Sequence, residues 1–185
     1  MVASWRPGKI VDLATGTGDL ALAVQKKLPD AEVTGVDFLP EMLELARRKG
    51  VRKTILADAM KLPFPDASFD CVTIAFGLRN MENWKDALVE MSRVLRPDGR
   101  LLVLEFSLPT VSILRIIYRF YLHRCLPLLG SFLTRKKSAY DYLGDSIEVF
   151  PSGHAMINLI EASGFKHVTL EPLSYGIVTI YTAQK

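Results

Sequence analysis

The stretch DLATGTGDLA, residues 12–21, decides the fold of this chain. It begins inside the short apolar run Lys9–Ala14 and leads into Asp19–Leu28, where apolar residues recur at helical spacing. A strand, a glycine loop and a helix in this order form the first half of a nucleotide-binding unit. The spacing Gly-x-Gly-x-x-Ala fits the dinucleotide fingerprint and equally fits the S-adenosylmethionine loop of methyltransferases. The loop by itself therefore leaves hydride transfer and methyl transfer both open.

The alternation that starts here continues along the chain. Strands are expected at Lys9–Ala14, Glu32–Val36, Lys53–Ala57, Cys71–Ala75, Arg100–Glu105, His167–Leu170 and Ile177–Thr182. Helices are expected at 19–28, 40–50, 84–95 and 152–162, with a turn at 96–99. Strands that alternate with helices form a parallel sheet, whereas the short connection 171–176 makes the last two strands an antiparallel hairpin. We predict an α/β, Rossmann-like fold with a seven-stranded, mostly parallel sheet, an antiparallel last strand and helices on both faces.

Size, charge and cysteine content narrow the function classes. The 185 residues suit a single domain, 1–185, and a net charge of +3 is too small to indicate nucleic-acid binding. Cys71 and Cys125 lack the spacing of metal ligands, so no metal site is expected and both thiols are expected to be buried and reduced. The N-terminus MVASWRPGKI has no long apolar stretch, which predicts a cytoplasmic protein without a signal peptide.

Residues at successive strand ends favour S-adenosylmethionine over NAD(P). Gly16 and Gly18 let the backbone approach a ligand, and Asp37, 19 residues after Gly18, is an acceptor for ribose hydroxyls. Asp58 beside the small Ala59 suits a purine ring, whereas a dinucleotide enzyme would place its second nucleotide near this point. The antiparallel last hairpin also matches the methyltransferase version of the sheet.

Longer segments carry a resemblance to one family. DLATGTGDL, LPFPDASFDCVTIAFGLRNM, RVLRPDGRLLVLEFS and SIEVFPS together resemble the ubiquinone/menaquinone biosynthesis C-methyltransferases (UbiE/MenG-like), over nearly the whole chain. The resemblance implies a class I methyltransferase fold and S-adenosylmethionine-dependent methylation of a polyprenylated quinol ring carbon, such as demethylmenaquinol to menaquinol. Family members usually have a further N-terminal segment with a Tyr-Asp-x-Met-Asn signature, which this sequence lacks and which is expected to help cover the active site.

Strand-end position and the family pattern together give one expected cofactor site. Asp12 is expected to support the glycine loop and the cationic end of S-adenosylmethionine, and Ala14 is a variant at the first position of that loop. The resemblance carries the family's cofactor contacts over to Thr17, Asp37, Asp58 and Ala59. The full set of expected cofactor-binding residues is Asp12, Ala14, Gly16, Thr17, Gly18, Asp37, Phe38, Asp58, Ala59 and Ala75.

Carbon methylation of a quinol needs an electron-rich ring, which the loss of a hydroxyl proton provides. Arg79, in the stretch AFGLRN at the fourth strand end, is expected to stabilise the developing phenolate, and Asn80 to orient a hydroxyl or a water. A structural salt bridge is the alternative for Arg79, and His154 and Tyr140 are weaker catalytic candidates. The competing functions are methylation of another phenolic or lipid acceptor, cofactor binding without catalysis, and an NAD(P) oxidoreductase.

The region 107–150 departs from the strand–helix alternation and is expected to form a basic, apolar helical insertion. Its part 111–137 has six Lys or Arg, no acid and many large apolar residues. Arg115, Arg119 and His123 recur every four residues and so share one helix face. This pattern predicts a lid over a lipophilic substrate channel, or a contact with the inner face of an anionic membrane that weakens with salt. Packing alone, on the sheet or in a homodimer, is the alternative.

Overall fold

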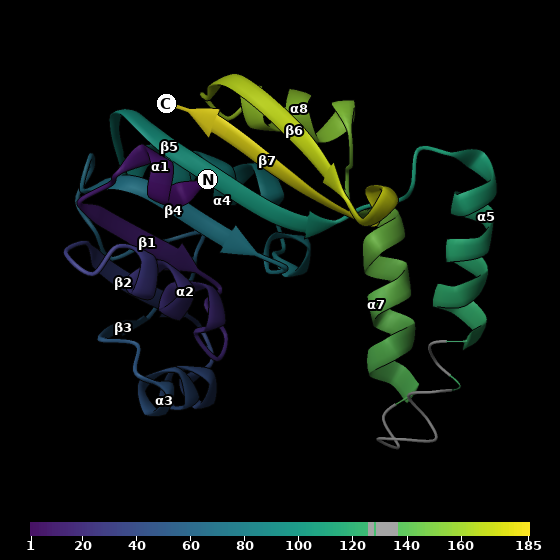
Figure 1. Ribbon diagram of the computed structural model, residues 1–185, viewed down its shortest axis with the longest axis horizontal. Coiled ribbons are helices and arrows are strands. Elements are labelled where there is room, and N and C mark those ends of the chain that lie inside the picture. The colour runs from purple at the N-terminus through teal and green to yellow at the C-terminus, as the bar shows by residue number, and fades with distance from the viewer. Residues whose placement is uncertain (126–127, 129–136) are drawn as a thin grey trace.

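All seven expected strands join one sheet. The protein is described from a computed structural model, which covers residues 1–125, 128 and 137–185. The strands are β1 (Lys9–Leu13), β2 (Glu32–Asp37), β3 (Lys53–Leu56), β4 (Phe69–Ala75), β5 (Leu95–Phe106), β6 (Lys166–Leu173) and β7 (Val178–Gln184), in the order β3-β2-β1-β4-β5-β7-β6 (Figure 1). β1 to β5 run parallel, and β7 runs antiparallel to both of its neighbours. The predicted seven-stranded, mostly parallel sheet is confirmed.

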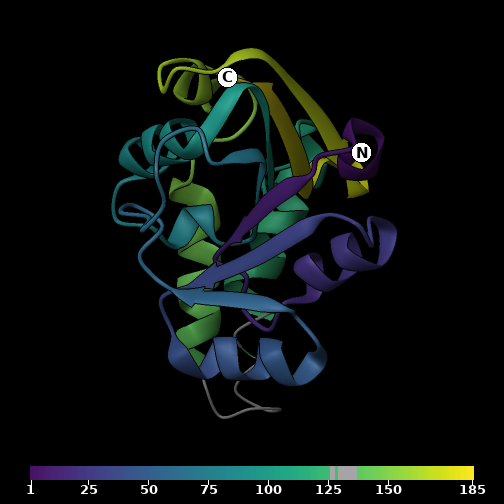
Figure 2. The ribbon, with the colours of Figure 1, turned by 90° about the vertical axis from the view of Figure 1, so that its left-hand side faces the viewer.

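Helices cover both faces of the sheet, as expected. They are α1 (Val2–Trp5), α2 (Asp19–Lys27), α3 (Pro40–Lys49), α4 (Trp84–Val94), α5 (Ser112–Phe120), α7 (Lys137–Val149) and α8 (His154–Glu161). Figure 2 shows α2 on one side of the sheet, with α4 and α8 on the other. Because side chains alternate along a strand, Ile10 of β1 packs in one core with Ala21 of α2, whereas Val11 joins Leu88 of α4 and Met156 of α8 in the other.

The order of the strands places a crevice at the centre of the sheet. The chain runs outwards from β1 through β2 to β3 and then returns to add β4 on the other side of β1. Ligands in open α/β sheets bind at the carboxyl ends of the strands, at such a reversal. The glycine loop, Asp37 and Asp58 stand at the carboxyl ends of β1, β2 and β3, so the topology brings them to one edge of the sheet.

One expected turn lies inside a strand. The residues 96–99, predicted as a turn, fall within β5, which pairs Phe69 with Leu95 and next pairs Cys71 with Arg100. The extra residues bulge out of the ladder, and Asp98 takes a left-handed backbone with a φ of 63°. The turn residues therefore kink the strand without ending it, because β4 supplies partners on both sides of the bulge.

The helices α5 and α7 form a pair beyond the end of the sheet (Figure 1). α5 continues into a π-helical turn, Tyr121–Cys125, and part of the stretch 111–137 lies outside the described residues. Arg119 Nε lies 3.0 Å and His123 Nε2 lies 3.2 Å from Glu148 Oε1 of α7. Two of the three residues of the predicted basic face, Arg119 and His123, are therefore directed at α7, whereas Arg115 donates to the carbonyls of Pro109 and Thr110. Most of the apolar side chains of α5 are exposed. In the part of the chain that the structure describes, no helix is long and apolar enough to cross a membrane.

The two thiols differ in burial. Cys71 is fully buried in the sheet, where desolvation raises its pKa to about 12, so it stays protonated at neutral pH. Cys125, at the end of the π-helical turn, is only half-buried, which corrects the expectation that both are buried. Both are free thiols.

Candidate active site

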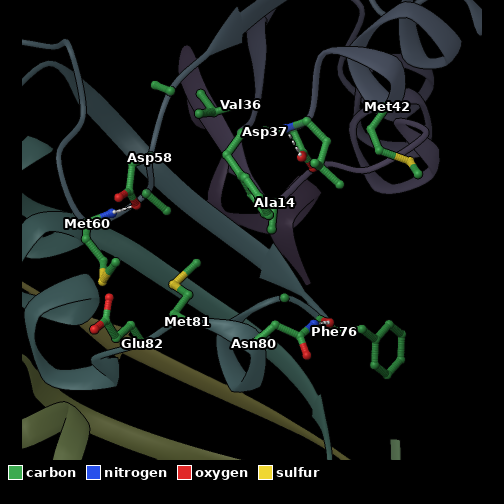
Figure 3. A pocket seen from close by; sticks show the side chains of 15 residues that line it. Ala14, Val36, Asp37, Met42, Asp58, Met60, Phe76, Asn80, Met81 and Glu82 are labelled. Atoms are coloured by element: carbon green, nitrogen blue, oxygen red, sulfur yellow. Dashed lines mark hydrogen bonds between the residues drawn. The ribbon is translucent and has the colours of Figure 1, made fainter. Parts of the chain in front are cut away.

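A cavity of about 630 Å³ opens at the carboxyl ends of the central strands. Figure 3 shows Asp37 and Asp58 on its walls, with Asn80 and Phe76 at the end away from Asp58. The volume is that of a typical small-molecule or cofactor site, and such sites are mostly apolar with a few fixed polar groups. The apolar side chains that line this cavity include Ala14, Val36, Leu39, Met42, Ala57, Ala59, Met60 and Met81.

The two glycines of the loop have different roles. Gly16 has a φ of 55°, and a Cβ added there would meet nothing within 4 Å, so its backbone borders open space. Gly18 has a φ of 84°, and a Cβ there would lie 2.4 Å from Val51 Cγ2 and 3.0 Å from Ala46 Cβ. The backbone at Gly16 is therefore open on the side where a Cβ would stand, whereas Gly18 allows the start of α2 to pack closely against the end of α3.

Asp12 is buried beneath the loop and does not line the cavity. Its carboxylate accepts hydrogen bonds from Thr15 Oγ1 at 2.7 Å and from Thr73 Oγ1 at 2.6 Å. Burial raises the pKa of Asp12 to about 6, and these hydrogen bonds oppose the shift. Asp12 thus connects β1, the glycine loop and β4 from inside the protein. Its expected role at the cationic end of the cofactor stays a prediction.

Asp37 and Asp58 are fixed on the cavity wall by backbone donors. Asp37 Oδ2 accepts from the Gly16 amide at 2.8 Å, and its Oδ1 accepts from the Leu39 amide at 3.0 Å. Asp58 Oδ1 accepts from the Met60 amide at 2.8 Å (Figure 3). Each carboxyl group has further lone pairs, so both can accept hydrogen bonds from a ligand while their orientation is held.

Strained backbone marks the ends of the two central strands. Ala14 after β1 and Phe76 after β4 both take left-handed conformations, with φ of 47° and 57°. A Cβ at Gly77 would lie only 2.4 Å from Ala14 Cβ, so a glycine at 77 is required for the two strand ends to meet. Such conformations cost about 1–3 kcal/mol each and gather at functional sites. Here they shape the floor of the cavity, which Ala14, Phe76 and Gly77 line.

Arg79 is held by other protein groups and does not line the cavity. It lies in a short 3₁₀ turn, Leu78–Asn80, with Nη1 2.5 Å from Glu105 Oε1 and 2.7 Å from the Phe76 carbonyl oxygen. The side chains of Arg79 and Glu105 are 10% and 0% exposed. Burial raises the pKa of Glu105, and the charge of Arg79 opposes that shift. The geometry favours a structural salt bridge for Arg79, and its catalytic role stays a prediction.

Asn80 points into the cavity and meets a residue that the sequence did not single out. Its side-chain amide donates to the Phe76 carbonyl at 3.4 Å, and its Oδ1 accepts from the Tyr142 hydroxyl of α7 at 3.2 Å. Tyr140, the neighbouring candidate, has a side chain outside the described part of the chain. The motif at 140–142 contains two tyrosines, and sequence alone does not tell which one faces the sheet.

The structure brings together half of the expected site residues. Those that line the cavity are Ala14, Asp37, Phe38, Asp58, Ala59 and Asn80. Those that do not line it are Asp12, Gly16, Thr17, Gly18, Ala75 and Arg79. Thr17 instead donates to Asp19 and accepts from Lys49, and His154 is an exposed residue at the start of α8. The roles of all these residues stay predictions, since position in a cavity is not a measured contact.

The cavity-lining residues that the sequence does not predict are mostly apolar neighbours of the expected ones. Met60 follows Asp58 and Ala59, Met81 follows Asn80, and Phe76 lies inside the stretch AFGLRN. A pattern that looks for polar groups at strand ends passes over such side chains. Glu82 adds a further carboxylate to the cavity, and nothing in the sequence pattern distinguishes it from a solvent-exposed acid.

Comparison with known sequences places the chain among quinone methyltransferases. The profile of the ubiE/COQ5 methyltransferase family matches residues 1–185. The chain is 47% identical to the demethylmenaquinone methyltransferase of Thermus thermophilus, covering 97% of this chain and 83% of that protein. It is 41% identical to the ubiquinone/menaquinone biosynthesis C-methyltransferase UbiE of Geotalea daltonii, covering 96% and 79%.

Solved structures agree with the fold. A SAM-dependent methyltransferase from Thermotoga maritima aligns with a TM-score of 0.69 at 22% identity, over 96% of this chain and 82% of that one. Human N-acetylserotonin methyltransferase in complex with SAM aligns with a TM-score of 0.68 at 18% identity, over 98% and 48%. At these identities the likeness concerns the class I methyltransferase fold alone.

Proposed function

Because the chain belongs to the ubiE/COQ5 methyltransferase family, we propose that it methylates a ring carbon of a polyprenylated quinol, with S-adenosylmethionine as the methyl donor. Demethylmenaquinol to menaquinol is the favoured reaction, since a relative at 47% identity is named a demethylmenaquinone methyltransferase. The observation that carries the proposal is the cavity that places Asp37, Asp58 and Asn80 together in a chain matched over its full length by the family.

The residues of the cavity fit the cofactor. Asp37 has lone pairs for ribose hydroxyls, and Asp58 with the small Ala59 gives an acceptor and space for a purine ring. The open backbone at Gly16 allows close approach by a ligand. When bound, S-adenosylmethionine supplies an electrophilic methyl group. An NAD(P) cofactor is disfavoured, because the family is one of methyltransferases.

The other end of the cavity suits the quinol ring. Asn80 has an amide that can orient a ring hydroxyl, and Phe76 and Met81 give an apolar surface that excludes water. Loss of the hydroxyl proton to solvent would raise the electron density at the neighbouring ring carbon. That carbon would take the methyl group as the methyl–sulfur bond breaks, S-adenosylhomocysteine would leave, and the ring hydrogen would depart as a proton to restore the aromatic ring. The protein's main contribution is to align the ring carbon with the methyl group.

The substrate is lipophilic, and we propose that α5 contacts the membrane that contains it. Ile113, Ile116 and Phe120 are exposed by 69%, 69% and 63%, whereas Arg119 is paired with Glu148. Contact through apolar side chains depends little on salt, in contrast to the salt-weakened binding expected from the basic residues alone. The proposed location is therefore peripheral, at the inner face of the membrane.

Vesicle flotation tests the membrane contact. The wild-type chain is expected to float with lipid vesicles at both low and high salt, and the variant Ile113→Asp with Ile116→Asp is expected to lose most of that binding. Analytical sedimentation of both proteins without vesicles serves as the control, because it measures their oligomeric state. A wild-type dimer that the double variant converts to a monomer would assign this face to a second copy of the chain instead.

Titration calorimetry followed by a turnover assay tests the activity. Binding of S-adenosylmethionine and S-adenosylhomocysteine, with no binding of NADH, is expected. Mass spectrometry of a reduced demethylmenaquinone after incubation should then detect one added methyl group. Cofactor binding without methylation of this or a simpler phenolic acceptor would indicate a protein that binds the cofactor without catalysis.

A further inference from the structure

A second, smaller cavity lies between α5 and the turn that joins β6 to β7. It has a volume of about 340 Å³, and its lining includes Pro109, Leu114, Ile117, Tyr118, Tyr121 and Tyr175. None of its described lining residues is charged. Aliphatic and aromatic side chains without a charged partner fit a hydrocarbon ligand and offer little to a polar one. We refer to this cavity as the tyrosine groove.

The turn that forms one wall of the groove is held in a strained conformation. Ser174, Tyr175 and Gly176 have φ of 48°, 60° and 86°, so two non-glycine residues in succession are left-handed. Buried Ser107 anchors the turn, because its Oγ donates to the Gly176 carbonyl at 2.8 Å and its amide donates to the Ile177 carbonyl at 2.9 Å. Strain that the surrounding structure maintains is typical of functional sites.

The strained turn presents an aromatic ring to solvent. Tyr175 is 86% exposed although its ring is large and mostly apolar. It lines the tyrosine groove and also a neighbouring hollow beside Val111 and Pro172. A side chain held outwards at the edge of an apolar groove can close over a ligand that lies in it, and burial of the ring would then favour binding.

Phe106 and Arg79 lie beside the end of the active site that faces this groove. Phe76, which lines the cofactor cavity, lies 4.6 Å from the ring of Phe106 at the end of β5, measured between ring centroids. The guanidinium of Arg79 covers Phe106 at 5.1 Å. Tyr118 of the groove is close enough to Arg79 for that charge to oppose the burial that raises the pKa of Tyr118. The cofactor cavity and the groove share no described lining residue, so a molecule that occupies both must pass beside Phe106.

We propose that the tyrosine groove holds the isoprenoid tail of the quinol, a proposal that rests on the function proposed above. The ring then lies at Asn80 and Phe76, and the tail passes Phe106 and leaves between α5 and the β6–β7 turn. In this arrangement the two ends of the substrate are bound by different kinds of side chain. Polar groups fix the ring, and apolar side chains select for the presence of a tail.

The tail-length dependence of methylation tests the proposal. The full chain is assayed in detergent micelles with two quinols that share one ring, one without a tail and one with a tail of several isoprene units. Wild-type protein should prefer the tailed quinol, since each buried CH₂ is worth about fourfold. In Leu114→Asp, the ratio of kcat/KM for the tailed over the tail-less quinol should fall by about tenfold or more.

Two further variants keep the result interpretable. Tyr175→Asn removes the ring but suits a left-handed backbone, so it should fold and lower the same ratio by roughly threefold. Val89→Asp places an acid at an exposed position of α4, outside both cavities, and should leave the ratio unchanged. A ratio that stays at the wild-type value in both Leu114→Asp and Tyr175→Asn would overturn the proposal.

A binding measurement separates this proposal from the proposed function. Titration calorimetry with a free isoprenoid alcohol needs no turnover. Binding by wild type that is lost in Leu114→Asp supports the groove even if neither quinol is methylated, in which case only the proposed reaction fails. Absence of binding, together with equal turnover of tailed and tail-less quinols, rejects the groove and leaves the reaction intact.

Discussion

The strand ends of the sheet and the α5–α7 pair distribute their charges in opposite ways. At the strand ends, Asp37 and Asp58 line an open cavity, while the apolar side chains of the sheet are buried. In the helix pair, Arg119 and Glu148 are turned towards each other, while Ile113 and Ile116 are exposed. The first arrangement suits a polar ligand such as a nucleoside, and the second suits a hydrocarbon or a bilayer.

The proposed reaction between S-adenosylmethionine and a polyprenylated quinol requires both arrangements. A methyl donor with an adenosine part needs fixed hydrogen-bond acceptors, whereas a polyprenylated quinol needs an apolar path. Arg79 and Glu105 lie at the junction, since Arg79 contacts the backbone of Phe76 at the cavity and covers Phe106 at the end of β5, shortly before α5 begins. Variants at the strand ends, in the helix pair and at the junction should therefore have separable effects.

The largest effect is expected at the junction. Arg79→Ala leaves the buried carboxylate of Glu105 without its partner, and breaking a buried ion pair costs about 3–5 kcal/mol in free energy of unfolding. Urea denaturation measures this loss. Arg79→Met combined with Glu105→Leu should regain most of the stability, because an apolar pair replaces the charges.

Arg96→Ala is the matched control for the junction. It breaks the ion pair between Arg96 Nη1 and Asp70 Oδ1, at 2.6 Å, in which Arg96 is 45% exposed, and should cost less than about 1 kcal/mol. An equal loss of stability in Arg79→Ala and Arg96→Ala would contradict the structural role. If the restored double variant still fails to methylate, Arg79 also acts in catalysis, as the sequence suggested.

Cofactor affinity should depend most on the strand ends. Asp37→Ala removes a carboxylate on the cavity wall and leaves the Gly16 amide unpaired, so the affinity for S-adenosylmethionine should fall roughly 10²-fold, at about 1.5–3 kcal/mol for a hydrogen bond to a charged group. Asp58→Asn keeps an acceptor oxygen and should lose about tenfold or less. If calorimetry finds the same loss of S-adenosylmethionine affinity in both variants, Asp37 is not the main carboxylate for cofactor binding.

Asp12 should make stability depend on pH. Its pKa is raised from 3.8 to about 6 in the folded chain, so the folded state binds this proton more tightly than the unfolded state. The contribution of Asp12 therefore favours folding below about pH 4, is lost as the pH rises to about 6, and then stays level. The total change is roughly 2–3 kcal/mol, at about 1.4 kcal/mol per pKa unit.

Asp12→Asn is expected to flatten this part of the stability profile. The amide can still bond with Thr15 and Thr73, whose hydroxyls can donate or accept. Thermal melts of both proteins at several pH values between 4 and 7 measure the difference. A profile for Asp12→Asn that keeps the wild-type slope would assign the pH dependence to another group.

The smallest effect is expected where the two regions touch. Tyr142→Phe removes the hydroxyl that donates to Asn80 Oδ1, which is worth about 1 kcal/mol and should lower kcat/KM for the quinol by about fivefold. Cofactor affinity should not change, since Asp37 and Asp58 are untouched. Tyr175→Phe removes a hydroxyl outside the cofactor cavity and should be neutral, so equal effects of the two variants would contradict a specific role for Tyr142.

Much of the sheet and part of the site follow from local sequence. The seven strands and the glycine loop are each defined by a short run of apolar residues or by a turn signal, and the order of elements fixes which strand ends meet. Asp37 and Asp58 were identified because a residue that follows a parallel strand necessarily stands at its carboxyl end. Such features depend only on the periodicity of apolar residues and on the position of a residue relative to the end of a strand, and both can be taken from the sequence.

Tertiary structure decided what depends on a distant partner. Arg79 is a plausible catalytic residue in sequence, but Glu105, 26 residues further along, holds its guanidinium. The sequence predicts Gly18 as a ligand contact, but in the structure Val51 and Ala46 occupy the space beside it. The basic face of α5 predicts a surface charge, but Arg119 of that face pairs with Glu148 of α7, while the apolar side chains of α5 are exposed. In each case the sequence supplied the side chain, and the packing of another element decided which way it faces, because a charge or a missing Cβ acquires its role only from the groups within a few ångströms of it.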